Sequence, residues 1–457
     1  MRWFSLHYFT FLGLLALGLG AGCTSFKPER ARQEHTAAFT SNLMQLAQAE
    51  LAEPLSLEDC IRIAMTNNYA VRKADLDRKL ARIGRQVAFT AFLPTVTASA
   101  SYNRYEKELP QQHEKRFGTA NLDITMPIVM PSSWFLYAAA RHGYASAGIA
   151  AHYVRQSIVM QTSVNYFNVL VQHDTIAALE TQFDAARETA TRVSGLADEG
   201  LVAAWEGDQA RFAAELRETE LQHARRQLAV LRSELLQGLG LPPHAPLVLS
   251  GDTGQAQRPE GTLDDLVLQA LARHPELAIA DRQVVIQDHQ VRQAFCNFLP
   301  VISLFSTGSW TGNDLARHAE NWVSGFHGIW TLFDGLANVA RYKASKVERE
   351  QTQLARENTF LSIMVGVVAA DAAVRDATEI ARVRRRAWDV ASAKWADYDA
   401  KAREGLIPLS DALDARARMD LAQVALVKSR FQERIAIANL ELAMGLTLVP
   451  TNHDGDP

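Results

Sequence analysis

The sequence AFTAFLPTVTASASYN occupies residues 88–103, and AFCNFLPVISLFSTGS occupies residues 294–309. The two stretches share Ala-Phe at the start and Phe-Leu-Pro in the middle. Proline disfavours helical geometry in the residue before it, so a helix is expected to end at each Phe-Leu-Pro. After the first proline the pattern alternates, with Val96, Ala98 and Ala100 on one face and polar residues between them. Both stretches therefore predict a switch from helix to strand.

The two stretches belong to an internal duplication. Residues 57–102 align without a gap with residues 263–308, so that Asp59 recurs 206 positions later as Asp265. A repeat of this length makes each half a structural unit. The division that follows is a first repeat at 56–241, a linker rich in Pro, Gly and Asp at 242–261, a second repeat at 262–446 and a C-terminal tail at 447–457.

Each repeat is predicted to contain two strands. They are expected at about 95–106 and 116–128 in the first copy, and at about 301–311 and 321–333 in the second. Strands that are apolar on one face and polar on the other suit a tilted membrane span. The alternative is a hairpin packed on a soluble core, but no other segment supplies strands for such a core. Four strands cannot close a barrel and lipid does not tolerate an open edge, so several chains must contribute.

Very long helices follow the strands. Proline is absent from about 133–198 and from about 336–404. At 1.5 Å per residue, ~66 residues reach roughly 100 Å, a length typical of coiled-coil packing. Pro275 is expected to kink or divide the helix that precedes the strands in the second repeat. The fold class is therefore mainly α with a small β part.

A shorter helix is expected to return after a turn in each repeat. The turns contain Gly200-Leu201 and Gly405-Leu406. Both glycines suit helix C-caps, which explains their identity without any partner.

The N-terminus is typical of an export signal at 1–22, with Arg2 before an apolar core that is too short to span a bilayer well. Small residues precede Cys23, so we expect lipidation of this cysteine. An ordinary signal peptide cleaved near Ala21 is the alternative. Residues 23–55 are then a lipid-anchored tether. No later run of about 18 apolar residues predicts a transmembrane helix.

Composition and motifs argue against several classes of protein. A net charge of −4 with 21% charged residues gives no indication of nucleic-acid binding. No metalloprotease, P-loop, nucleophile-elbow or Cys-x-x-Cys motif is present, so we expect no enzyme activity, no cofactor and no metal site. Cys60 and Cys296 fall at non-equivalent places in the two repeats and are expected to pack as small apolar residues.

The order of these features resembles the TolC-type outer membrane efflux family. Leu57-Glu58-Asp59 and Leu263-Asp264-Asp265 look like the family's repeat starts, and each Phe-Leu-Pro is similar to its helix-to-strand junction. Leu332-Phe333-Asp334-Gly335 resembles its strand-to-helix junction, whereas residues 127–131 of the first copy depart from it. The resemblance implies a homotrimeric channel-tunnel, with a 12-stranded barrel in the outer membrane and a hollow helical cylinder in the periplasm.

The resemblance also implies a gate. Asp411 and Asp414 follow the second turn at the spacing that the family uses for aspartates lining its closed periplasmic entrance. A ring of such carboxylates in a trimer would attract cations. The alternative is a solvated helix face. The family's basic residue two positions after the glycine is replaced by Ile407, and Arg403 lies nearby.

The resemblance further implies partners. A periplasmic adaptor would dock at the turns that contain Gly200, Leu201, Gly405 and Leu406, and an inner-membrane pump would supply energy. We predict a passive exit duct of a tripartite efflux or type I secretion system in the outer membrane. A periplasmic coiled-coil scaffold or adaptor lipoprotein is the alternative. Because a wide aqueous lumen encodes no single compound, drug, metal, peptide and protein export all stay open.

Overall fold

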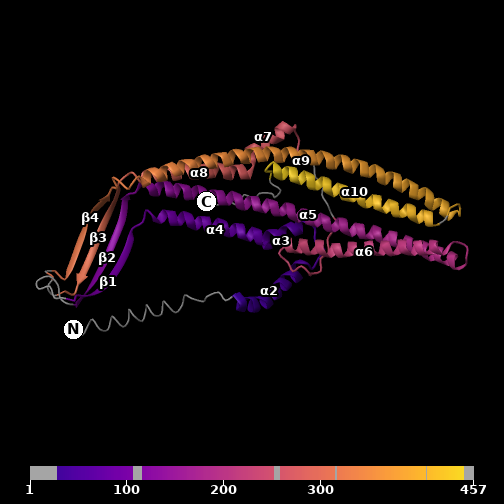
Figure 1. Ribbon diagram of the computed structural model, residues 1–457, viewed down its shortest axis with the longest axis horizontal. Coiled ribbons are helices and arrows are strands. Elements are labelled where there is room, and N and C mark those ends of the chain that lie inside the picture. Colours follow the sequence, from indigo (N-terminus) through magenta and orange to yellow (C-terminus); the bar gives the residue numbers. More distant parts are fainter. Residues whose placement is uncertain are drawn as a thin grey trace.

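The computed structural model describes residues 28–106, 116–251, 258–313, 316, 318–407 and 409–446. The predicted signal peptide, Cys23 and the tail at 447–457 lie outside these residues. A sheet forms one end of an elongated molecule, and long helices run from it to two turns at the opposite end (Figure 1). The predicted mainly α fold with a small β part is confirmed.

The four strands form one antiparallel sheet. Its order is β1 (Thr95–Arg104), β2 (Arg116–Val129), β3 (Val301–Thr311) and β4 (Glu320–Ile329). Pairing of β2 with β3 joins the hairpins of the two repeats into one sheet. Across this seam the Thr307 hydroxyl donates to Asp123 Oδ1 at 2.7 Å. Among the described strands, β1 and β4 therefore have a partner on only one side.

The predicted strand at 321–333 extends too far. Strand β4 ends at Ile329, because Trp330 turns back and its indole nitrogen donates to the Phe298 carbonyl at 3.0 Å. Gly335 and Leu336 then adopt left-handed backbone geometry with φ of 68° and 70°. In the first repeat β2 continues to Val129 and the next helix starts at Pro131. This difference explains why the sequence of the first junction departs from that of the second.

The two faces of the sheet differ in polarity. One face exposes large apolar side chains, including Val96 at 61%, Phe326 at 74% and Trp322 at 54% exposure. The opposite face carries hydroxyl contacts such as Ser101 Oγ to Thr119 Oγ1 at 2.7 Å. The alternation predicted from the sequence therefore holds through the pairing register. An exposed apolar face of this kind requires a covering phase or partner.

The helices of the two repeats correspond to one another. The first repeat contains α3 (Leu57–Asn67), α4 (Tyr69–Thr90), α5 (Pro131–Asp198) and α6 (Ala204–Gly238), and the second contains α7 (Leu263–Arg273), α8 (Pro275–Cys296), α9 (Ala337–Arg403) and α10 (Leu409–Ala443). Helices α5 and α9 have 68 and 67 residues, in accord with the predicted lengths.

The helices form one curved layer rather than a globular bundle. Near the sheet, the contacts follow the order α4, α5, α8, α9, and beyond the midpoint they follow α6, α5, α10, α9. Helix α9 thus forms one border of the layer along its whole length, and α4 and α6 form the other (Figure 1).

Both repeats break their first helix at the same place. Pro275 starts α8 after α7 ends at Arg273, as the sequence predicted. The equivalent break in the first repeat has no proline and was not predicted. There Asn68 caps α4 through Oδ1, which accepts from Ala70 N–H at 2.8 Å, and its amide nitrogen donates to the Gly238 carbonyl at 2.7 Å. In the second copy His274 occupies the equivalent position, and its Nδ1 accepts from the Glu276 N–H at 3.2 Å. A capping side chain therefore starts the helix in both copies, and proline is added in the second copy only.

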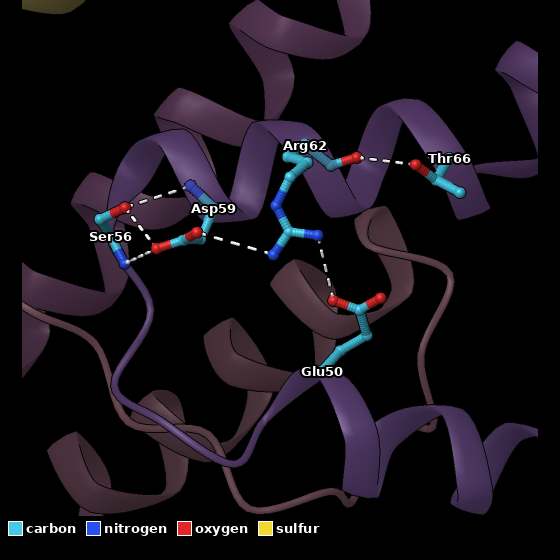
Figure 2. Close-up of polar contacts among 5 residues, drawn as sticks. All are labelled: Glu50, Ser56, Asp59, Arg62 and Thr66. Atoms are coloured by element: carbon cyan, nitrogen blue, oxygen red, sulfur yellow. Dashed lines mark hydrogen bonds and ion pairs between the residues drawn. The ribbon is translucent and has the colours of Figure 1, made fainter.

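A capping box begins each repeat. The Ser56 hydroxyl accepts from Asp59 N–H at 3.1 Å, and Asp59 accepts from the Ser56 N–H at 3.2 Å (Figure 2). Arg62 then reaches Glu50, at the end of α2 (Pro28–Glu50), at 3.4 Å. The segment predicted as a tether thus contains a helix, which this ion pair joins to the first repeat.

Two small hydrophobic cores lie near the midpoint of the layer. The first surrounds Tyr166, Leu235 and Leu239, and includes Cys60. The second surrounds Leu266, Val367 and Leu440. Cys60 and Cys296 are both free and buried, and burial raises the pKa of the Cys60 thiol to about 12. The reactive thiolate is therefore disfavoured, as expected for a cysteine that packs as an apolar residue.

Gly240→Ala should be much more destabilising than Gly200→Ala. Both glycines have a φ of 72°, but a Cβ on Gly240 would lie 2.6 Å from the Asn67 carbonyl oxygen, whereas nothing lies within 4 Å of one on Gly200. Left-handed strain alone costs about 1–2 kcal/mol, and the clash should add about 1–3 kcal/mol. Thermal unfolding followed by circular dichroism measures the difference. Equal losses would contradict the packing described here.

Candidate functional site

The two turns farthest from the sheet have the same backbone geometry. In the first, the Gly200 N–H donates to the Ala197 carbonyl at 3.0 Å and the Leu201 N–H donates to the Leu196 carbonyl at 2.9 Å. Gly405 and Leu406 repeat this pattern with Ala402 at 3.1 Å and Lys401 at 2.9 Å. These are Schellman motifs, so the predicted role of both glycines as C-caps is confirmed.

The leucines after these glycines are exposed. Leu201 and Leu406 each retain 67% of their accessible surface. Leu241 follows Gly240 in the same motif at the end of α6 and retains only 4%. A Schellman motif usually packs this side chain against its own helix. The two far turns instead present an apolar side chain to the surroundings.

Asp411 and Asp414 lie in the first two turns of α10. Both are exposed, and because they are three residues apart they share one face of the helix. Ala412 and Ala415, with 4% exposure each, lie on the buried side. The helix therefore carries the two carboxylates on one exposed face, and their role at an entrance stays a prediction.

The basic residue beside Asp414 is Arg418, whereas the sequence pointed to Arg403. The Arg418 Nε donates to Asp414 Oδ2 at 2.9 Å, whereas Arg403 pairs with Asp399 at 2.6 Å. The structure therefore does not bring Arg403 to the aspartates. Spacing of four residues along α10 was the available signal for Arg418, since side chains at i and i+4 are neighbours.

Asp414 and Arg418 line a groove between three helices. Helix α5 contributes Gln182 and Thr189 to the groove, and α6 contributes Ala213. In the first repeat the positions equivalent to Asp411 and Asp414 are Glu206 and Gln209, 205 residues earlier. The equivalent of Arg418 is Ala213, so the Asp414–Arg418 pair exists in one repeat only.

Asp420 lies about two turns farther along α10, in a second groove against α5. Burial raises the pKa of its carboxyl group, and the nearby Arg416 and a hydrogen bond with Thr181 partly oppose this effect. The Arg416 Nε lies 3.9 Å from Asp420 Oδ2. No sequence pattern marks this half-buried carboxylate, because its burial depends on the packing of α10 on α5.

The described part of the chain contains neither a metal-binding cluster nor a membrane-spanning helix. No group of three or more His, Cys, Asp or Glu side chains there is arranged to hold a metal ion. Among the same residues, no helix combines the length and apolar character needed to cross a bilayer.

Comparisons with known proteins agree with this architecture. A family model described as "Outer membrane efflux protein" matches residues 60–241 and 266–446. These two matches correspond to the two repeats and cover most of the chain. The chain belongs to the outer membrane efflux protein family. Family membership identifies it as an outer membrane efflux channel protein.

Solved structures share the fold at low sequence identity. The Campylobacter jejuni CmeC outer membrane channel has a TM-score of 0.74 at 18% identity, over 85% of this chain and 85% of that chain. Vibrio cholerae VceC has 0.70 at 16% identity, over 85% and 96% of the two chains. Neisseria gonorrhoeae MtrE, in its open state, has 0.71 at 18%, over 85% and 89%. A search of curated protein sequences gave no match.

Asp420→Asn should stabilise the protein at pH 7. A folded-state pKa above the ordinary value means that folding favours the protonated carboxyl, so the charged form lowers the free energy of unfolding. This loss of unfolding free energy grows as the pH rises through the raised pKa of Asp420. It vanishes well below the ordinary aspartate pKa of 3.8.

We expect the melting temperature to rise at pH 7 and not to change near pH 3. Asp208→Asn is the control, because Asp208 is 71% exposed and pairs with Arg211 at the surface. Destabilisation by Asp420→Asn at pH 7 would instead mean that the ion pair with Arg416 dominates.

Proposed function

We propose that three copies of this chain form a passive exit duct of a tripartite efflux or type I secretion system, from the periplasm to the exterior. The observation that carries the proposal is that one chain forms an incomplete wall. In the part of the chain that the structure describes, no further helix extends either border of the helical layer, and β1 and β4 each lack a neighbouring strand on one side. Three chains of four strands would give a 12-stranded barrel, and six repeats would line the helical tunnel.

The border of α4 supports this assembly. It exposes an apolar stripe with heptad spacing: Leu76 at 64%, Leu80 at 67%, Ile83 at 45% and Val87 at 62% exposure. Shifted by 206 residues, Ile83 corresponds to His289 of α8, which stacks on His142 of α5 with ring centroids 5.6 Å apart. The face that α8 packs on α5 within the chain is thus the face that α4 leaves open.

The other border carries a matching stripe. On α9, apolar residues recur every seven positions and stay exposed: Val347 at 55%, Leu354 at 65%, Leu361 at 60% and Val368 at 46%. Since α9 is the counterpart of α5, α9 of one chain is suited to cover α4 of the next. Apolar heptads on two such helices are typical of a coiled-coil seam.

The gate and the anchor are part of the same proposal. We propose that Asp411 and Asp414 constrict the periplasmic entrance, where three chains would bring six carboxylates together, with Arg418 as the basic neighbour. Cys23 would carry a lipid that anchors the chain to the outer membrane. Transport of this kind is passive and needs no catalytic group in the chain.

The exposed turns are proposed as the docking site of a periplasmic adaptor, which would link the duct to an inner-membrane pump. Leu201 and Leu406 support this assignment, because an apolar side chain that its own motif does not cover is suited to a partner.

Purified protein in planar bilayers tests the channel proposal. Discrete conductance steps are expected from the wild-type protein or from gate variants. If neither gave conductance under any opening condition, the chain would act as a periplasmic scaffold or adaptor.

Asp411→Ala/Asp414→Ala should increase single-channel conductance severalfold and reduce cation selectivity, because the carboxylate ring at the entrance is lost. Glu206→Ala/Gln209→Ala, at the equivalent positions of the first repeat, is the matched control and should have a smaller effect. Unchanged conductance and selectivity in the aspartate variant would exclude a gate at this place.

Leu201→Ser/Leu406→Ser should weaken adaptor binding without changing conductance, because it removes the exposed side chains and keeps both glycine caps. Site-specific crosslinking of the cognate adaptor in cells measures the binding. Val248→Ser is a control for loss of an exposed apolar residue elsewhere, since Val248 has 63% exposure. Equal crosslinking in the wild-type protein, the double leucine variant and the Val248→Ser control would rule out docking through these leucines.

A further inference from the structure

One side of α4 is strongly basic close to the sheet. The sequence from 78 to 94 contains no acidic residue. At 1.5 Å per residue, its cationic side chains start about 8–18 Å from the helix end at Thr90. We call this group the basic face of α4, and it consists of Arg78, Lys79, Arg82 and Arg85.

The basic face continues onto α5. Arg78 and Arg85 lie over the Tyr144 ring, with 5.9 Å and 4.8 Å from guanidinium carbon to ring centroid. Arg141 lies three residues before Tyr144 on the same helix, and α5 has no acidic residue before Asp174. The positive charge therefore spans two adjacent helices.

Helix geometry places the basic face on the outside of the proposed tunnel. With 3.6 residues per turn, the side of α4 that packs on α5 is separated from the centre of the open stripe by about 160° on one side and about 200° on the other. These directions are means over the buried residues Val71, Ala74 and Ala88 and over the exposed stripe Leu76, Leu80, Ile83 and Val87. In a closed ring of helices the broader arc faces outward. The basic residues lie on this broader arc, and Gly84 lies on the narrower one.

Aromatic rings lie between the basic face and the strands. Phe92 contacts Trp134 with ring centroids 5.1 Å apart, and Phe89 contacts Tyr137 at 5.9 Å. Trp134 is 68% exposed. A belt of amphipathic rings at the end of membrane-facing strands is typical of the bilayer–water interface. The order along the molecule is thus apolar strand face, aromatic rings, basic face.

The second repeat does not share this charge. The residues equivalent to the basic face are Val284, Val285, Asp288 and Val291. Arg292 pairs with Asp288 at 2.8 Å. If these four cationic residues served only to keep a long helix soluble, we would expect similar residues at the equivalent positions of the second repeat.

We propose that the basic face binds anionic phospholipid headgroups, phosphatidylglycerol or cardiolipin, in the periplasm-facing leaflet of the outer membrane. This inference rests on the proposed function, because it requires the sheet to lie in the bilayer. Cations within about one Debye length of an anionic surface are attracted to it. A membrane fits better than an acidic protein, because the basic face adjoins the aromatic rings and follows the apolar strand face directly. Three such faces around a trimer would fix its height in the bilayer.

The test is native mass spectrometry of the full-length trimer in detergent, titrated with phosphatidylglycerol and with phosphatidylethanolamine. The wild-type protein should prefer phosphatidylglycerol. Lys79→Gln/Arg82→Gln keeps the two arginines that lie over Tyr144, and it should weaken phosphatidylglycerol binding about tenfold. Lys79→Arg/Arg82→Lys keeps the charge and should bind as the wild type does.

Arg384→Gln/Arg386→Gln is the matched control, because it removes two charges from the part of α9 remote from the sheet and should not change lipid binding. An equal loss in this control, or no headgroup preference in the wild type, would overturn the inference. Loss of adaptor co-purification with unchanged lipid binding would also overturn it, by indicating an acidic protein partner. Conductance of the same preparation separates the two proposals: channels without a lipid preference refute only this inference, and absence of channels refutes the proposed function.

Discussion

The outer edges of β1 and β4, which have no neighbouring strand among the described residues, are the constraint on which the rest of the structure depends. A sheet edge in lipid has no water to satisfy its N–H and C=O groups, so it must find another strand. The same chain leaves apolar stripes open on α4 and α9, along the same two borders of the wall. One closure of several chains would satisfy both needs together. Because the sheet edges and the apolar stripes lie on the same two borders, the single chain has the form expected of one segment of a tube.

The two repeats share most of the elements that form the wall of that tube. The positions at which the two repeats differ carry the proposed functional features. Equivalent positions keep the capping boxes at Ser56 and Thr262, and the C-cap glycines at the turns. They differ where a function is proposed. Asp414 and Arg418 correspond to Gln209 and Ala213, and the basic face of α4 corresponds to three valines and an aspartate. Helix and strand geometry tolerates such exchanges on exposed faces, so the two repeats are free to diverge there without loss of fold.

Much of the architecture follows from local signals. Phe-Leu-Pro marks the helix ends, alternation marks the strands, and absence of proline marks the long helices, so most of these elements were predicted with bounds close to the observed ones. Pro275 predicted a helix break, but the equivalent break at Asn68 was missed because an asparagine cap has many other uses in a sequence. The end of β4 was misplaced because Trp330 continues the alternating pattern while its indole bonds to Phe298 across the junction.

The sequence by itself determined most of the elements, their order, their doubling and the placement of Asp411 and Asp414 on one helix face. These depend on residues that are close along the chain, where backbone geometry leaves few choices. Only the tertiary structure decided that α5 lies between α6 and α10, that Asp420 is half buried, and that Leu201 stays exposed while Leu241 is buried. These properties depend on which helices meet, and packing between segments far apart in sequence leaves no local pattern to read.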